Sequence, residues 1–288
     1  MPVATVDGLE IAYDVIGDGG RPWTFTPGGR FSRETPGLRE MAEAIAAEGY
    51  TAVIWDRPNT GASSVCFEGD NESAMQADAL GGLLRSLDLT GAVIAGGSGG
   101  SRVSLLAATR HRDLAAGLAM WWISGGIFGL MSLAVHYCGG SIRAAWFDGM
   151  EAVAALPEWQ DVIAANPRNR DRILAQDPKE FIRTLESWMA VYCPDDENAM
   201  VPGVPNADVR GLDIPSLVFR SGESDLHHTR HTSELLASLL PQSTLVEPPW
   251  PDTEWNDRHH EPGAPLFVRW PLLVPQLLSW AKENNLNP

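Results

Sequence analysis

The chain has 288 residues, of which 44% are hydrophobic and 20% are charged, as in an ordinary soluble globular protein. Its formal net charge of −16 argues against nucleic acid or an anionic membrane as a partner, because phosphate-rich surfaces repel an acidic chain. The three cysteines are too few and too scattered for a disulfide framework or a zinc site.

The cellular compartment is predicted from three features. The first residues show no basic start and no apolar core of a signal peptide. No uninterrupted apolar run is long enough to cross a bilayer, and the sparse cysteines suit a reducing environment. We therefore expect a cytoplasmic protein that acts on a small molecule, binds neither nucleic acid nor membrane, and is compatible with a homodimer.

Strands and helices alternate over the first 127 residues. The predicted strands are 3–6, 9–15, 22–29 with its turn, 51–56, 91–96 and 114–124. The predicted helices are 37–50, 71–89 and 98–111. This alternation is typical of a parallel sheet with helices on both faces.

The alternation of predicted strands and helices stops in the middle of the chain. Residues 128–200 have helical periodicity and no strand candidate, and a proline-rich linker follows at 193–213. Strands are predicted again at 215–222 and 243–249, and helices at 231–241 and 267–284. A helical insertion therefore interrupts one α/β domain.

A serine lies among four glycines, Gly96-Gly97-Ser98-Gly99-Gly100, between a strand and a helix, and it matches G-x-S-x-G. A strand that turns into a helix within one residue holds that residue in a strained conformation with its side chain exposed, and only small neighbours fit. The helix start also offers unpaired N–H groups to a developing negative charge. We predict that Ser98 is a nucleophile; the alternatives are a phosphate loop or a plain turn.

Four pieces of the chain resemble the α/β-hydrolase superfamily, over nearly its whole length. They are "VDGLEIAYDVIGDG", "TFTPGGR", "VIWDRPNTGASS", which is similar to the family's D-x-x-G-x-G-x-S turn, and the glycine-flanked Ser98. The resemblance implies an eight-stranded, mostly parallel sheet with helices on both faces, a helical cap after the sixth strand, and a serine–acid–histidine triad in that order. We expect a core domain of residues 1–127 and 209–288 and a cap of residues 128–208.

The resemblance also implies an oxyanion hole. The family usually has a histidine where this chain has Pro27, and a backbone N–H shortly after that position binds the oxyanion. Gly29 is expected to supply this group, and Gly99 the second one. Arg30 is predicted to bind a substrate carboxylate near the mouth of the site, unless it is a surface arginine.

The acid and the base are assigned by the same resemblance. Asp225 occupies the last position of the family's G-x-x-D after a strand, with Glu223 as the second choice and a helix cap as the alternative role. The base is expected in the loop after the eighth strand, where His260 is the first choice and His259 the second. A displaced base such as His228, or no triad, stays open.

The remaining histidines predict no metal, because no carboxylate pattern of zinc-like geometry accompanies them, and no cofactor is expected. Aromatic residues of the middle segment and of the strand before it are candidates for the pocket wall. The predicted substrate-binding residues are Arg30, Trp121, Trp122, His136 and Trp146. Such a wall favours an apolar or aromatic acyl or alcohol group.

These residues predict a serine hydrolase, most simply a carboxylesterase, that acts through an acyl-enzyme. Lactones, amides and carbon–carbon bonds next to a carbonyl are alternative substrates. Because Pro27 replaces the usual histidine and the base is displaced, a ligand-binding relative, a lyase or a cofactor-free enzyme is the second class of function.

Overall fold

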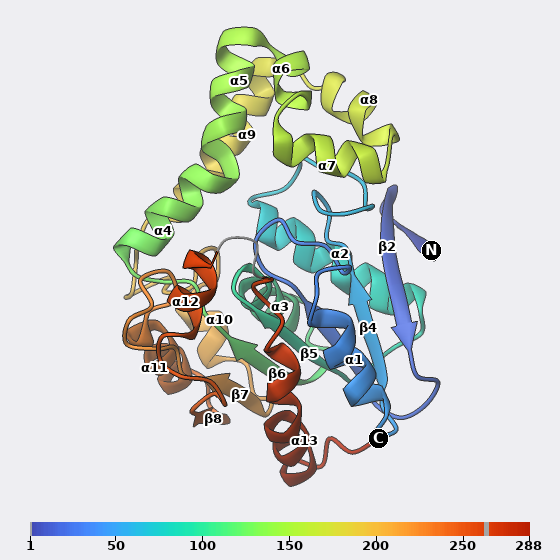
Figure 1. Cartoon of the computed structure of the whole chain (residues 1–288), viewed down its shortest axis with the longest axis vertical. Helices are drawn as coiled ribbons and strands as arrows, with labels where there is room; N and C mark the ends of the chain where they lie inside the picture. The colour runs from blue at the N-terminus through green and yellow to red at the C-terminus, as the bar shows by residue number, and fades with distance from the viewer. Residues whose placement is uncertain (1, 262–264) are drawn as a thin grey trace.

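The computed structural model describes residues 2–261 and 265–288 of the chain (Figure 1). Eight strands form one sheet in the order β1-β2-β4-β3-β5-β6-β7-β8. β1 pairs antiparallel with β2, and β2 pairs antiparallel with β4, whereas every other neighbouring pair is parallel. The strands are β1 (Val3–Val6), β2 (Leu9–Ile16), β3 (Pro22–Thr26), β4 (Thr51–Trp55), β5 (Ala92–Gly97), β6 (Ala115–Trp121), β7 (Ser216–Phe219) and β8 (Ser243–Val246). The predicted mostly parallel, eight-stranded sheet is confirmed.

Helices cover both faces of the sheet. α1 (Leu38–Ala46) and α13 (Val274–Glu283) pack on one apolar cluster, together with the side chains of Trp23 and Phe25 from β3. The opposite cluster is covered by α2 (Glu72–Ser86), α3 (Gly99–Arg110) and α11 (Arg230–Leu239). β3, β4 and β5 are buried along their whole length, as expected of parallel strands with helices on both faces.

A helical insertion lies between β6 and β7, and Figure 1 shows most of it stacked on one end of the sheet. Its elements are α4 (Ile127–Ala134), a π-helical turn η1 (Val135–Gly139), α5 (Gly140–Asp148), α6 (Met150–Ala154), α7 (Pro157–Ala165), α8 (Arg168–Leu174), α9 (Pro178–Ala190) and α10 (Asn206–Arg210). A third apolar cluster, with Phe67, Trp159, Phe181 and Trp188 at its centre, joins these helices to the loop before α2. The domain boundaries at residues 128 and 208 stay a prediction.

The last part of the chain differs from the predicted elements. A short helix α12 (Glu254–His260) occupies what was predicted to be loop. The last helix is shorter than the predicted range 267–284: a 3-10 turn η2 (Trp270–Leu273) precedes α13. Pro271 and Pro275 lie at the first positions of these two segments, where a missing N–H costs no hydrogen bond.

Candidate active site

Ser98 lies at the junction of β5 and α3 in a strained backbone conformation. Its φ is 56° and its ψ is −127°, values that a residue with a side chain rarely adopts. A Cβ on Gly96 would lie 2.5 Å from the carbonyl oxygen of Gly100, and a Cβ on Gly100 would lie 2.0 Å from the carbonyl oxygen of Thr26. Only glycine fits at either position, which is the steric reason for the motif around the serine.

A hydrogen-bonded chain connects Ser98, His228 and Asp225. Ser98 Oγ and His228 Nε2 are 2.9 Å apart, and His228 Nδ1 and Asp225 Oδ2 are 3.0 Å apart. Because Asp225 accepts the Nδ1–H, Nε2 is free to accept the serine proton. The arrangement can deprotonate a hydroxyl and direct it at an electrophile.

The acid and the imidazole are both held firmly. Asp225 Oδ1 accepts backbone N–H groups from His227 and His228, each at 2.9 Å, so the carboxylate caps the turn that carries the histidine. His228 is 1% exposed and Asp225 3%. The ring of Trp255 meets His228 edge-on at 4.3 Å between centroids, and Trp122 stacks at 6.1 Å. These contacts fix the ring orientation.

His259 and His260, the predicted bases, make no contact with Ser98 in the structure. Both are exposed on α12, where His260 Nδ1 lies 2.6 Å from the carbonyl oxygen of Asn256 and His259 stacks on Trp255. The loop after β8 folds into a helix anchored by Glu254, which accepts hydrogen bonds from Arg258 and Arg269. This segment therefore supplies a wall, and the histidine beside Ser98 comes from the loop after β7.

The predicted acid lies where the sequence placed it, next to the imidazole. The second choice, Glu223, is exposed and accepts a hydrogen bond from Arg230. One local signal was available for the base: Asp225 and His228 are three residues apart, a spacing that lets one turn bring both side chains together. From the sequence, His228 is predicted only as a displaced alternative base.

The two predicted oxyanion-hole glycines lie side by side near Ser98. A Cβ on Gly99 would lie 3.3 Å from Gly29 N, and a Cβ on Gly28 would lie 3.0 Å from Ser98 Oγ. The turn is anchored by Arg57, whose Nη2 donates to the carbonyl oxygens of Gly28 at 3.1 Å and of Gly29 at 2.7 Å. No motif in the sequence predicts this role for Arg57.

Arg57 is buried, and no carboxylate of the residues that the structure describes pairs with it. Burial lowers its pKa to about 10, partly offset by Tyr137 and Glu72. The guanidinium thus stays charged at neutral pH, directly behind the turn that carries Gly28 and Gly29. A positive charge at this place favours a negative charge on the cavity side.

A cavity of about 350 Å³ opens in front of Ser98 and His228. Its remaining lining residues are Gly29, Phe31, Ser132, Leu133, His136, Tyr137, His227, Trp255, His259, Leu266 and Phe267. Most of this wall is apolar or aromatic, with polar groups gathered near the serine. The cavity is large enough for a small organic substrate.

The predicted substrate-binding residues divide into three groups. His136 lines the cavity, as predicted. Trp121 and Trp122 are buried behind it: Trp121 packs on Phe219 and Trp270, and Trp122 on His228. Trp146 is 70% exposed on α5 and is not among the lining residues, because its face of the helix points to solvent. Arg30 is also not among the lining residues and forms an ion pair with Glu72, so its predicted contact with a substrate carboxylate stays a prediction.

Two histidines of the cavity wall stay uncharged at neutral pH. Burial, followed by the charge of Arg30, lowers the pKa of His136. Burial, followed by the nearby His228, lowers the pKa of His227, which accepts the Trp255 indole N–H at 3.2 Å. Neither of these two rings therefore adds a positive charge to the wall at neutral pH, which suits an uncharged substrate.

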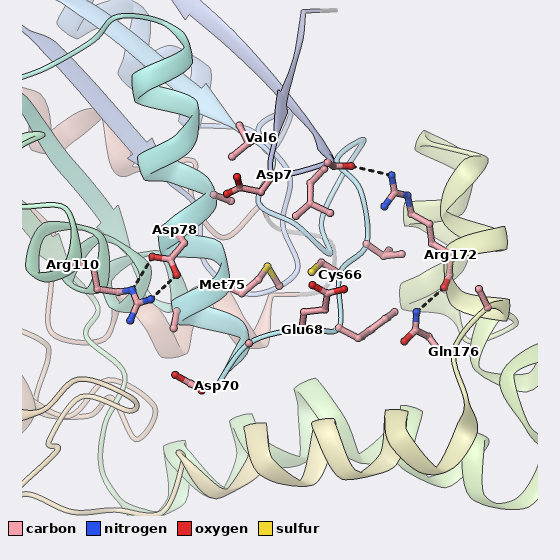
Figure 2. Close-up of a pocket in the computed structure, with 18 residues that line it drawn as sticks. Val6, Asp7, Cys66, Glu68, Asp70, Met75, Asp78, Arg110, Arg172 and Gln176 are labelled. Carbon is pink, nitrogen blue, oxygen red and sulfur yellow. Dashed lines mark hydrogen bonds and ion pairs between the residues drawn. The ribbon is translucent and has the colours of Figure 1, made fainter.

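A second cavity, of about 570 Å³, lies between the β1–β2 hairpin, the loop before α2 and α8 (Figure 2). Asp78 pairs with Arg110 at its edge, and Arg172 donates to the carbonyl oxygen of Gly8. Cys66 is in its wall, but none of its described lining residues is a histidine that could activate the thiol. This cavity lacks the nucleophile–base pair found at Ser98.

Two other kinds of feature are absent from residues 2–261 and 265–288. No group of three or more histidine, cysteine, aspartate or glutamate residues is placed to hold a metal ion. No helix in these ranges is both long and apolar enough to traverse a bilayer.

No family model matches the chain, and no curated protein matches it. Solved structures resemble it over nearly its whole length. A malate-bound thermophilic esterase from Thermogutta terrifontis has a TM-score of 0.63 at 20% identity, with 98% of both chains covered. The enol-lactonase from Burkholderia xenovorans LB400 has a TM-score of 0.59 at 18% identity and covers 98% of this chain and 100% of that one. An alpha/beta hydrolase from Sphaerobacter thermophilus has a TM-score of 0.59 at 19% identity and covers 97% and 99%. At these identities the likeness establishes a shared fold.

Proposed function

Since the chain has the α/β-hydrolase fold, as its sequence predicted, we propose that it is a serine hydrolase that cleaves a small, largely apolar ester. The observation that carries this proposal is the distance of 2.9 Å between Ser98 Oγ and His228 Nε2 inside a cavity. The presence of an esterase and an enol-lactonase among the similar structures agrees with it. Carboxylesterase activity is the simplest form of the proposal.

The first half of the reaction forms an acyl-enzyme. His228 takes the proton of Ser98 as the serine oxygen attacks the ester carbonyl, and Asp225 stabilises the imidazolium that results. The oxyanion is held by the backbone N–H groups of Gly99 and Gly29. His228 then gives its proton to the leaving alkoxide, and the alcohol departs.

The second half releases the acid. Water enters the place of the alcohol, His228 removes one of its protons, and the hydroxide attacks the acyl carbonyl. Collapse of the second oxyanion returns the proton to Ser98 and frees the carboxylic acid. One oxyanion donor lowers the barrier by about 3 kcal/mol in well-studied serine hydrolases.

The cavity supports the choice of substrate. Phe31, Leu133, Trp255 and Phe267 offer apolar surface, and His136 and His227 stay neutral at neutral pH. A volume of about 350 Å³ fits a short acyl chain or a single aromatic ring better than a long lipid. We therefore expect acetate and butyrate esters to be better substrates than palmitate esters.

The experiment combines turnover with active-site labelling. The wild-type protein should hydrolyse p-nitrophenyl acetate and butyrate, and a fluorophosphonate should label Ser98 and no other serine in the folded protein. Ser98→Ala should lose both, while Ser132→Ala, in the same cavity, should keep the label. Equal turnover by the wild type and Ser98→Ala, or an unlabelled Ser98, would refute the proposal and favour a ligand-binding protein.

A further inference from the structure

Tyr137 lies on the π-helical turn η1 (Val135–Gly139), where the insertion passes over the cavity. π-helical turns inside α-helices are rare and are found frequently at functional sites. Here the turn directs two consecutive side chains, His136 and Tyr137, to the same cavity as Ser98. Tyr137 belongs to the apolar cluster of the insertion, but its hydroxyl reaches the glycine turns beside Ser98.

The phenol oxygen of Tyr137 borders the predicted oxyanion hole. A Cβ on Gly99 would lie 3.1 Å from Tyr137 Oη and 3.3 Å from Gly29 N. One small volume is therefore bounded by the two backbone donors and by the hydroxyl. Such a hydroxyl is a hydrogen-bond donor that can reach an oxygen placed between the two glycines.

The proton of this hydroxyl is free. No carbonyl or carboxylate oxygen of the described residues accepts it. The rings of His136 and Tyr192 pack on the Tyr137 ring, and two cations lie near it, Arg30 at 5.0 Å and Arg102 at 5.9 Å from the ring centroid. A guanidinium can only donate, so neither group competes for the tyrosine proton.

Buried positive charge stands behind the hydroxyl. Arg57 and Arg102 are 2% and 4% exposed, and Arg57 Nε and Arg102 Nη1 have no hydrogen-bond partner among the described residues. Glu72 is the one described carboxylate close enough to affect the pKa values of Arg30, Arg57 and Arg102 together. Three cations against one anion leave a site that is complementary to a negative charge appearing in front of it.

We propose that Tyr137 is a catalytic residue that donates a third hydrogen bond to the oxyanion of the tetrahedral intermediate. It keeps its proton throughout, so no bond to its oxygen breaks. The ligand of this site is the oxygen of an acyl carbonyl as it gains negative charge, and the arginines hold the ring and favour that charge. The inference rests on the proposed hydrolase activity.

Tyr137→Phe removes the hydroxyl and keeps the ring. The matched control is Tyr192→Phe: Tyr192 stacks on Tyr137 with centroids 6.0 Å apart and accepts a hydrogen bond from Arg102, but it is outside the cavity. With p-nitrophenyl acetate, we expect Tyr137→Phe to lower kcat about tenfold to hundredfold with KM changed less than about threefold. Tyr192→Phe should keep kcat within about threefold.

A trifluoromethyl ketone, which forms a tetrahedral adduct with a serine, gives a second readout. Its inhibition constant should rise in Tyr137→Phe by about the same factor as kcat falls, since both report the oxyanion. Unchanged kcat and unchanged inhibition in Tyr137→Phe would overturn the role. So would a loss of kcat with unchanged ketone binding, or the same losses in Tyr192→Phe, because these indicate a merely structural tyrosine.

Failure of the proposed hydrolase activity would give a different set of results. If wild-type protein neither hydrolyses the esters nor reacts with the fluorophosphonate, the hydrolase assignment is refuted together with the role of Tyr137. If the wild type is active and labelled, the tyrosine variants alone decide this inference.

Discussion

Ser98, Asp225 and His228 all follow strands of the sheet, whereas Tyr137 and the cavity wall around it belong to the helical insertion. The two regions are held together differently. The sheet is filled by two continuous apolar clusters, one on each face. The apolar cluster of the insertion also includes Val65 and Phe67 of the loop before α2, and hydrogen bonds from Asn169 to Ser63 and from Trp188 to Gly69 add to this contact. Ser98, Asp225 and His228 thus stand at the ends of strands, and the insertion shapes the space in front of them.

The largest effect should come from the base on the sheet side. His228→Ala should lower kcat/KM for p-nitrophenyl acetate by about 10⁴-fold, because Ser98 then has no group to take its proton. His260→Ala, an exposed histidine of α12, should stay within about twofold. Initial rates of the purified variants measure both. A larger loss in His260→Ala than in His228→Ala would return the base to the loop after β8.

The next effect concerns the anchor of the oxyanion turn. Arg57→Met removes the hydrogen bonds to Gly28 and Gly29 and the charge behind them, so kcat should fall by about 10²-fold. Arg57→Lys keeps the charge and loses the planar donor geometry, and it should lie between wild type and Arg57→Met. If the lysine variant equals the methionine variant, positioning of the turn matters and charge does not.

The third substitution weakens the hydrogen bonds between the insertion and the sheet domain. Asn169 is fully buried, accepts the Val65 N–H at 2.9 Å and donates to the Ser63 carbonyl at 2.9 Å. Asn169→Ala leaves both partners unsatisfied, so the free energy of unfolding should fall by about 2 kcal/mol. Urea denaturation measures this loss. Ester turnover at urea concentrations below the unfolding transition should change less than in Arg57→Met. An equal loss of turnover would show that this contact between the insertion and the sheet domain also positions the reacting groups.

The smallest effect is expected from a substitution in the sheet domain away from the site, and it concerns the free energy of unfolding. Burial alone would raise the pKa of Asp78, but hydrogen bonds and charges from Arg110 and His111 outweigh it and lower the pKa. Asp78 therefore stabilises the folded state above its ordinary pKa of 3.8, and this contribution is lost as the pH falls through the lower folded value. Because the pair is largely exposed, Asp78→Asn should cost about 0.5 kcal/mol at pH 7. The difference from wild type in urea denaturation should shrink below pH 4; a constant difference would exclude the ion pair as its cause.

Local patterns were enough to predict the parts of the fold and site that neighbouring residues determine. The β-branched run before Ser98, the glycines that clash with any Cβ, and the acid after β7 are all short-range features. The position of His228 is also set locally, by the turn that Asp225 caps, but family spacing pointed to the loop after β8 instead. That loop folds as α12 because Glu254 gains two arginine partners, one of them 15 residues away.

Long-range pairing explains the other differences. The guanidinium of Arg30 is able to bind a substrate carboxylate, but it already pairs with Glu72, which is 42 residues away in sequence. Arg57 and Tyr137 are 80 residues apart and meet only because the insertion folds over the turn at Gly28 and Gly29. The periodicity of hydrophobic residues along the chain does not indicate which distant residues will pair.

Placing the acid and the imidazole three residues apart on one turn has an evolutionary consequence. No residue of the described segment 250–261 takes part in the proton relay, so positions of this segment other than Trp255, which packs on His228, can change without removing the base of Ser98. Selection, or a directed-evolution library, can therefore remodel specificity there through cavity residues such as His259, while the reacting residues are inherited unchanged.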